Sequence, residues 1–202
     1  MGKLILVRHG ESEGNRFRRF TSSPNAALTD LGRQQAYEAA CRIREQFKPA
    51  LVIASPYLRA RDTARIIATE LAVPLEIEAG FREQSLGQLA GQPYDLVLND
   101  PSFDRDRSWQ WRPAGGESHE DVLARTGPLV DQVANRFARE EVVIVSHGGV
   151  MRSLWAHVAG GWDGAHVPAN CGIVLVEHDA GRYLTVRLVA GDTDANLRAS
   201  GG

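Results

Sequence analysis

The sequence predicts an α/β fold of three layers (α/β/α), with a mostly parallel central sheet, helices on both of its faces and a small cap insertion. Two apolar runs, residues 3–7 and 141–145, have the length of buried strands, and each stops at a polar segment that contains Gly. Between them, short apolar runs alternate with stretches of helical spacing, as in parallel sheets joined by helices. The 202 residues, 43% of them hydrophobic, suit a single domain over residues 1–202 with a sizeable core.

The first part of the chain is predicted to supply three strands and two helices. Strand 3–7 leads into a polar loop over residues 10–28, and Thr29 with Asp30 begins a helix that ends before Pro49. Strand 51–54 is followed by a helix that Ser55 and Pro56 open, and by a strand over residues 73–77. The residues at helical spacing on the apolar face of the first helix are Ala36, Tyr37, Ala40, Cys41, Ile43 and Phe47.

An irregular stretch at about residues 91–116 is predicted to form the cap insertion over the site. Residues 94–98 could make one or two helical turns, and an excursion that bears Trp109 and Trp111 follows them. These two aromatic side chains either belong to the ligand-facing surface of the cap or anchor the excursion to the body of the protein, as large aromatic residues commonly do.

The remainder of the chain is predicted to complete the sheet. Glu117 and Ser118 begin a helix that runs to about Arg139, and Pro128 predicts a kink or an early end near Gly127. Strand 141–145 and a helix over residues 150–158 follow, and the N–H groups at the start of that helix would favour anions. Apolar runs at 173–177 and 183–189 predict a closing hairpin, and residues 190–202 predict a loose tail.

Charge and cysteine content exclude several classes of function. The chain has 23 basic and 25 acidic residues and a formal charge of −2, so it has no general attraction for nucleic acid or for an anionic membrane, and neither is expected as a partner. Cys41 and Cys171 are too few for a disulfide framework or a zinc site of Cys type, and the start of the chain lacks a long apolar stretch. We therefore expect a cytoplasmic protein with a local anion site, and the oligomeric state stays open.

A histidine follows each of the two long apolar runs. His9 comes after strand 3–7 and Arg8, His147 comes after strand 141–145, and Gly is next in both places. Ligands of α/β sheets bind at the carboxyl ends of the strands, and Gly lets backbone approach a ligand closely. Arg8 is always charged and can hold a phosphate through two parallel hydrogen bonds. The pattern therefore predicts a phosphate site at this edge of the sheet.

Five segments in this order resemble the histidine phosphatase superfamily, the phosphoglycerate-mutase-like proteins. They are RHGES at 8–12, SPYLRA at 55–60, FREQSLG at 81–87, GGES at 115–118 and SHGG at 146–149. The order and spacing of these segments match those of the superfamily over about residues 1–190. A lone Arg-His-Gly triplet would be a weak signal, but five matching segments are specific. The resemblance implies a phosphatase-type member with a phosphohistidine intermediate.

The resemblance and the chemistry of phosphate together suggest roles for particular residues. The resemblance makes His9 the nucleophile and Glu83 the proton donor to the leaving group, which afterwards activates water. Because the oxygens of a phosphate monoester repel a nucleophile, fixed cations must surround the transferring group, and the scheme needs no metal and no cofactor. The residues expected around the phosphate are Arg8, Arg59, His147 and Asn15, and Thr21 and Gly148 are further candidates for substrate binding.

Three functions remain open from the sequence. The favoured one is a metal-independent phosphomonoesterase that acts on a small phosphorylated metabolite. The first alternative is a phosphoglycerate-type mutase; mutases of the resembled family generally carry a longer insertion after the proton donor, whereas only 33 residues separate Glu83 from Glu117 here (117 − 83 − 1). The second alternative is a non-catalytic module that binds a phosphorylated ligand, and such a module would need neither a nucleophile nor an acid.

Overall fold

Six strands form one mixed sheet in the order β3-β2-β4-β1-β5-β6. The computed structural model describes residues 1–21, 23–98, 100–179 and 181–191. Neighbouring strands among β1 to β4 pair in parallel, and β5 and β6 add an antiparallel hairpin beside β1. The strands are β1 Gly2–Arg8, β2 Leu51–Ala54, β3 Leu75–Ile77, β4 Glu141–Ser146, β5 Ile173–Asp179 and β6 Arg182–Ala190.

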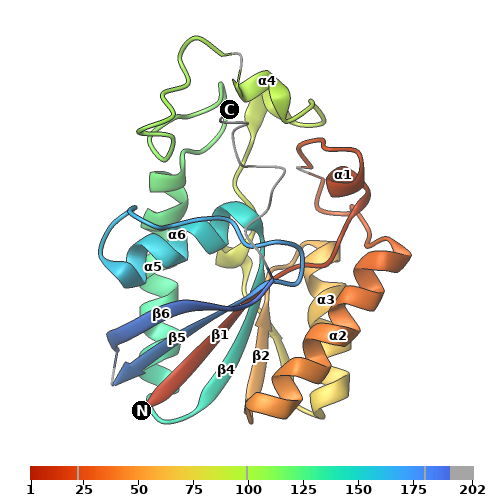
Figure 1. Cartoon of the computed structure of the whole chain (residues 1–202), viewed down its shortest axis with the longest axis vertical. Helices are drawn as coiled ribbons and strands as arrows, with labels where there is room; N and C mark the ends of the chain where they lie inside the picture. The colour runs from red at the N-terminus through yellow and green to blue at the C-terminus, as the bar shows by residue number, and fades with distance from the viewer. Residues whose placement is uncertain (22, 99, 180, 192–202) are drawn as a thin grey trace.

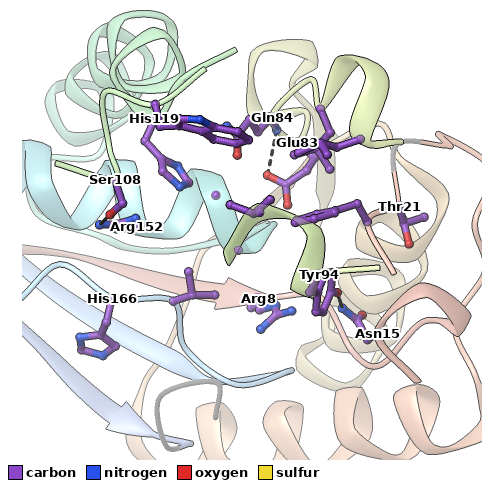
Figure 2. A pocket seen from close by; sticks show the side chains of 18 of the residues that line it. Arg8, Asn15, Thr21, Glu83, Gln84, Tyr94, Ser108, His119, Arg152 and His166 are labelled. Atoms are coloured by element: carbon purple, nitrogen blue, oxygen red, sulfur yellow. Dashed lines mark hydrogen bonds between the residues drawn. The ribbon is translucent and has the colours of Figure 1, made fainter. Parts of the chain in front are cut away.

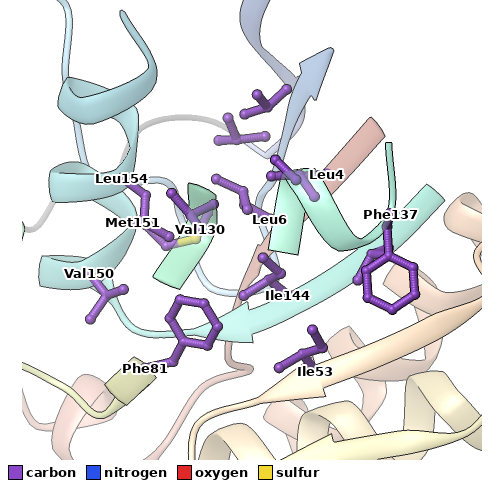
Figure 3. Packing of buried hydrophobic residues seen from close by; sticks show 14 of the residues in the cluster. Leu4, Leu6, Ile53, Phe81, Val130, Phe137, Ile144, Val150, Met151 and Leu154 are labelled. Atoms are coloured by element: carbon purple, nitrogen blue, oxygen red, sulfur yellow. The ribbon is translucent and has the colours of Figure 1, made fainter. Parts of the chain in front are cut away.

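Helices cover both faces of this sheet, which confirms the predicted three layers (Figure 1). Side chains along β1 alternate between the two faces: Leu4 and Leu6 pack toward α5 and α6, and Ile5 and Val7 pack toward α2 and α3. Figure 3 shows the first of these two clusters. The four helices are α2 Asp30–Gln46, α3 Leu58–Leu71, α5 His119–Arg136 and α6 Gly148–Ala159.

The predicted helices differ from the observed ones in detail. Thr29 caps α2 by accepting a hydrogen bond from the backbone N–H of Gly32, as the sequence indicated. The placement of Tyr37 on the apolar face is wrong, because its side chain is 45% exposed. An early end of α5 at Pro128 is also wrong, since the helix continues to Arg136. Val122, Val130 and Ala134, on both sides of the proline, are buried, and this packing outweighs the one missing backbone hydrogen bond.

Short helices and loops lie over the carboxyl ends of the parallel strands (Figure 1). They include α1 Glu13–Arg16 and α4 Asp95–Leu98, with two 3-10 helices at Ala79–Phe81 and Gly87–Leu89. Trp109 stacks on Trp162 with centroids 5.7 Å apart, whereas Trp111 packs edge-on against Phe103. Trp109 therefore anchors the excursion to the loop after α6, and Trp111 belongs to the cap itself. The limits of the cap and of the domain stay predictions.

The carboxyl-terminal hairpin is longer than expected. Strand β6 ends at Ala190, one residue beyond the predicted run, and the predicted tail at about residues 190–202 stays a prediction, since residues 192–202 lie outside the described residues. In the part of the chain that the structure describes, no helix is both long and apolar enough to span a lipid bilayer.

Candidate active site

One pocket of about 400 Å³ opens at the carboxyl ends of β1 and β4. Seven of the eight residues expected at the site line it, and the eighth, His147, lies directly behind the wall with its ring centroid 5.2 Å from that of His9. The pocket thus opens at the edge of the sheet where the sequence predicts a phosphate site. The seven lining residues are Arg8, His9, Asn15, Thr21, Arg59, Glu83 and Gly148.

The parallel register of β1 and β4 brings the two histidines together. Arg8 pairs with Ser146 at the end of the ladder, and the backbone N–H of His9 donates to the carbonyl of Ser146 at 2.9 Å. The next residue on each strand is therefore a histidine at the same edge of the sheet. Two residues 138 positions apart (147 − 9) meet because their strands are neighbours in parallel register.

His9 is held with one ring nitrogen ready for attack. Its Nδ1 lies 2.7 Å from the carbonyl oxygen of Gly10, which can only accept, so Nδ1 carries the hydrogen and Nε2 keeps its lone pair. Arg59 Nε donates to that Nε2 at 3.1 Å. Burial, followed by the charges of Arg59 and Arg8, holds the pKa of His9 well below its ordinary value. The imidazole is therefore neutral near neutral pH.

Arg8 and Arg59 supply positive charge on either side of His9. Both are nearly inaccessible, with exposed fractions of 3% and 2%. Backbone carbonyls orient the two guanidinium groups: Arg8 donates to Pro168 at 2.8 Å, and Arg59 donates to Ser23 at 3.1 Å and to Thr21 at 3.3 Å. Burial lowers the pKa of Arg59, although it stays a cation. Backbone carbonyl oxygens thus help to orient both guanidinium groups.

His147 differs from the expectation that it adds a cation. It is fully buried, and burial together with the charge of Arg59 holds its pKa well below the ordinary value. Its Nε2 lies 2.7 Å from the hydroxyl of Ser55 at the end of β2, and its Nδ1 has no partner among the described residues. A neutral ring can offer a phosphate a hydrogen bond, but no full charge. His147 also caps the amino end of α6 with extended backbone.

Glu83 places its carboxylate in the pocket, beside the first turn of α6 (Figure 2). Its Oε1 accepts a hydrogen bond from the backbone N–H of Gln84 at 2.8 Å. Arg125 donates to its backbone carbonyl at 3.2 Å, and Arg125 also pairs with Glu117 at 2.9 Å. A Cβ on Gly149 would come within 2.8 Å of the carboxylate. Glu83 thus sits on a loop that Arg125 holds in place, and a side chain at position 149 would displace its carboxylate.

Asn15 and Thr21 flank the phosphate end of the pocket. The side-chain oxygen of Asn15 accepts hydrogen bonds from Ser12, and its amide nitrogen donates to the hydroxyl of Tyr94 at 3.3 Å. This orientation leaves an N–H donor facing the pocket. Thr21 contributes mainly through its backbone carbonyl, which accepts from Arg59. The nearby cationic run of residues 16–19 is exposed and does not line the pocket.

A sequence profile of the Histidine phosphatase superfamily (branch 1) matches residues 4–191. The chain belongs to this superfamily. A glucosyl-3-phosphoglycerate phosphatase of Mycolicibacterium vanbaalenii is 32% identical over 169 residues, which are 78% of this chain and 74% of the relative. A 2,3-bisphosphoglycerate-dependent phosphoglycerate mutase of Nitrobacter hamburgensis is 34% identical over 75% of this chain and 78% of the mutase. The resemblance found in the sequence is confirmed.

A solved structure shows that the similarity extends to the whole fold. A mycobacterial glucosyl-3-phosphoglycerate phosphatase in complex with VO3 superposes on this histidine phosphatase with a TM-score of 0.82 at 26% identity. The alignment covers 95% of this chain and 99% of that protein. The mostly parallel sheet with helices on both faces is therefore the fold of the superfamily.

Sequence reasoning missed several residues that shape the site. Asn170 donates to the carbonyl of His9 at 2.9 Å, and Arg152, His119 and Ser108 line the pocket on the side of α6. Arg152 lies four residues after Gly148, a spacing that puts both on one face of a helix and could have found it. Nothing in the local sequence indicated the other three, because the cap brings Ser108, the start of α5 brings His119 and the loop after α6 brings Asn170 to the site. Within the described residues, no three His, Cys, Asp or Glu side chains are grouped so as to hold a metal ion.

Proposed function

We propose that this histidine phosphatase is a phosphomonoesterase that hydrolyses a small phosphorylated metabolite without a metal, through a phosphohistidine on His9. The observation that carries the proposal is the state of His9. It is neutral, its Nε2 lone pair faces two buried arginines, and a carboxylate lies in the same pocket. A binding module would gain from the arginines but would have no use for the nucleophile or the carboxylate.

The first step transfers the phosphoryl group to the enzyme. The phosphate oxygens of the substrate take the hydrogen bonds of Arg8 and Arg59, so that Arg59 releases His9 Nε2. The Nε2 lone pair attacks phosphorus while the bond from phosphorus to the ester oxygen breaks, and protonated Glu83 gives its proton to that oxygen. The alcohol leaves, and the arginines together with the N–H groups at the start of α6 stabilise the charge of the transition state.

The second step returns the enzyme to its starting state. The Glu83 carboxylate takes a proton from a water molecule, whose oxygen attacks the phosphorus of the phosphohistidine. The bond from phosphorus to Nε2 breaks, inorganic phosphate leaves, and Glu83 is protonated for the next cycle. The fixed charges of Arg8 and Arg59 do the work that a divalent cation does in metal-dependent phosphatases.

The shape of the pocket supports a small substrate. About 400 Å³ suits a metabolite rather than a folded phosphoprotein. The cap contributes both apolar and polar side chains to the pocket wall, and they are Tyr94, Asp95, Val97, Phe103, Ser108 and Trp111.

Turnover of p-nitrophenyl phosphate in EDTA tests the proposal. The unaltered protein should release p-nitrophenolate at the same rate with and without the chelator, and His9→Ala should lose at least about a thousandfold of that rate. Acid-sensitive, base-stable label from ³²P-substrate should appear on the unaltered protein and be absent from His9→Ala. Equal rates for the two proteins would contradict a nucleophilic role for His9.

A mutase remains the second candidate, because a phosphoglycerate mutase is among the similar proteins. A mutase returns the phosphoryl group from His9 to a second hydroxyl rather than to water. Incubation with 3-phosphoglycerate distinguishes a phosphatase from a mutase. We expect inorganic phosphate to exceed 2-phosphoglycerate among the products, and the reverse ratio would identify a mutase.

A cytoplasmic location also stays part of the proposal. Cys41 and Cys171 are both free thiols, which suits a reducing compartment. Cell fractionation followed by immunodetection tests the location, and recovery with an exported fraction would contradict it.

A further inference from the structure

The loop that carries Glu83 is bonded to one residue far along the chain, Glu117. The side chain of Arg82 donates to the two carboxylate oxygens of Glu117 at 2.9 and 3.1 Å, and the backbone N–H of Ser85 donates to one of them at 2.8 Å. The side-chain amide of Gln84 donates to the backbone carbonyl of Glu117 at 2.6 Å. Glu117 therefore contacts the residue before Glu83 and the two residues after it.

Arg125 adds a second connection between Glu117 and this loop, from helix α5. It donates to the two carboxylate oxygens of Glu117 at 2.9 and 3.3 Å. The same guanidinium donates to the backbone carbonyls of Gly80 at 2.6 Å and Glu83 at 3.2 Å. Because one carboxylate accepts from Arg82, Arg125 and Ser85, its position determines where the backbone on both sides of Glu83 lies.

An ionised carboxylate suits this position better than an amide does. Burial raises the pKa of Glu117, but the hydrogen bonds from Arg82 and Arg125 outweigh burial and lower the pKa to about 2. Glu117 is therefore charged at neutral pH and accepts hydrogen bonds at both of its oxygens. A glutamine would turn an NH2 group, which can only donate, toward one of the two guanidinium groups.

The charge of Glu117 also bears on the carboxylate of Glu83. Arg82 and Arg125 both donate to the backbone carbonyl of Glu83, at 3.4 and 3.2 Å, so two cations lie beside this residue. Opposite charges that are partly shielded from water attract each other strongly. Without the counter-charge of Glu117, the two arginines would draw the carboxylate of Glu83 toward themselves and away from the pocket.

We propose that Glu117 is a positioning residue for the general acid. By holding Arg82, Arg125 and the backbone of the loop, it keeps the carboxylate of Glu83 in the pocket and free to transfer a proton. The proposal rests on the proposed function, because it takes Glu83 as the acid. Glu117 does not line the pocket, so it acts through Glu83 and not on the substrate.

The dependence of the rate on the leaving group tests this role. Glu117→Gln should lower kcat for the alkyl ester glycerol 3-phosphate by about 10- to 100-fold, because an alkoxide needs a well-placed acid. KM should change less than about threefold, since Arg8 and Arg59 still hold the phosphate. The burst of p-nitrophenolate from p-nitrophenyl phosphate should also stay within about threefold, because this group leaves without a proton. Damage to the fold as a whole would instead slow both substrates alike.

A double variant tests whether Glu117 acts through Glu83. In the Glu83→Gln background, Glu117→Gln should lower the rate on glycerol 3-phosphate by less than about a further threefold, because the acid that it positions is already absent. Two losses that multiply would show that Glu117 acts independently of Glu83, and they would overturn the proposal.

Glu76→Gln is the matched control. Glu76 accepts two hydrogen bonds from Arg136, at 2.9 and 3.0 Å, on strand β3 and outside the pocket, so neither rate should change. If Glu83→Gln slows only the alkyl ester but Glu117→Gln slows neither substrate or both equally, the proposal is wrong and the proposed function stands. If Glu83→Gln itself shows no such selectivity, the acid role of Glu83 fails and the role of Glu117 fails with it.

Glu117→Asp provides the test if Glu117→Gln does not fold. It keeps the negative charge, but its carboxylate is one CH2 group shorter and cannot reach Arg82, Arg125 and the N–H of Ser85 together. We expect a loss of about 3- to 10-fold in kcat on glycerol 3-phosphate with an unchanged burst of p-nitrophenolate. A full rate on glycerol 3-phosphate, or equal losses on the two substrates, would overturn the proposal.

Discussion

His9 and His147 show how burial decides the chemistry of a single residue. Both rings are buried beside two arginines, and for both the largest cause of the lowered pKa is the loss of water. A charged His9 would have no lone pair to attack phosphorus, so under the proposed mechanism the arginines that bind the phosphate also keep His9 neutral. Arg59 serves both purposes directly, because it donates to His9 Nε2 when no phosphate is present.

Replacement of Glu83 by Gln separates its role as an acid from its role in binding. Glu83→Gln should slow the hydrolysis of an alkyl phosphate by about a hundredfold or more, because an alkoxide leaves poorly without a proton. The first turnover of p-nitrophenyl phosphate should be spared, since p-nitrophenolate is a good leaving group. Stopped-flow absorbance should therefore show a preserved burst of p-nitrophenolate followed by a slower steady rate.

Glu13→Gln is the control for this measurement. Glu13 is an exposed acid at the start of α1 and does not line the pocket, so neither rate should change. Equal losses on the two substrates for Glu83→Gln, with no burst, would remove Glu83 from the acid role.

At the scale of elements, α6 organises the site. Its cap residue is His147, its first two residues are Gly148 and Gly149, and its next turn carries Arg152. The glycines permit a close approach: a Cβ at Gly148 would meet the side chain of Val167 at 2.9 Å. The start of the helix can therefore face the phosphate while Glu83 rests against it.

Gly149→Ala should reduce activity without reducing stability. The added methyl group would come within 2.8 Å of Glu83 Oε1, and that carboxylate is the movable end of a side chain, so it should be displaced from its position. Ala is also the better helix residue by up to about 1 kcal/mol, which favours an unchanged or higher melting temperature. We expect a loss of about tenfold or more in kcat/KM on an alkyl phosphate, measured together with thermal unfolding.

Gly161→Ala supplies the comparison, because no atom lies within 4 Å of the position where its Cβ would be. It should leave activity unchanged. A Gly149→Ala variant with full activity would mean that the carboxylate of Glu83 works equally well from a shifted position.

At the scale of the whole molecule, buried neutral histidines should make stability depend on pH. The pKa is lowered for His9, His119, His147 and His178. Histidines of the unfolded chain have the ordinary pKa of 6.5, so below that pH the unfolded chain takes up protons that the folded chain does not. The free energy of unfolding should therefore fall as the pH falls from 7 to 5. Each such proton contributes a slope of about 1.4 kcal/mol per pH unit.

Urea unfolding at several pH values checks this dependence. Carboxylates with a lowered pKa, such as Glu117 at about 2, lose their contribution only below about pH 4.5 and do not affect this window. His178→Leu, on β5 and outside the pocket, should make this dependence on pH less steep, because it removes one histidine whose pKa is lowered by folding. A free energy of unfolding that stays constant from pH 7 to 5 would contradict neutral burial of these rings.

Local patterns in the sequence were enough to predict the layers of the fold and the edge of the sheet where the pocket opens. An apolar run that stops at Arg8-His9-Gly10 is a strand end whatever surrounds it, because strand formation and burial follow from the run itself. The same holds for α2, whose cap at Thr29 is a contact between neighbours in the chain. The matching segments then identified the family, since their order along the chain is a property of the sequence alone.

Only the tertiary structure decided how these parts act together. The sequence could not show that α5 continues through Pro128, that Tyr37 is exposed or that His147 is neutral, because each depends on what packs against the residue. Helical spacing from Gly148 could have placed Arg152 at the site, but only the tertiary structure shows that its described partners are Ser108 and Trp162. Burial and charge act between residues that are far apart in the chain, and the packed fold alone determines which of them meet.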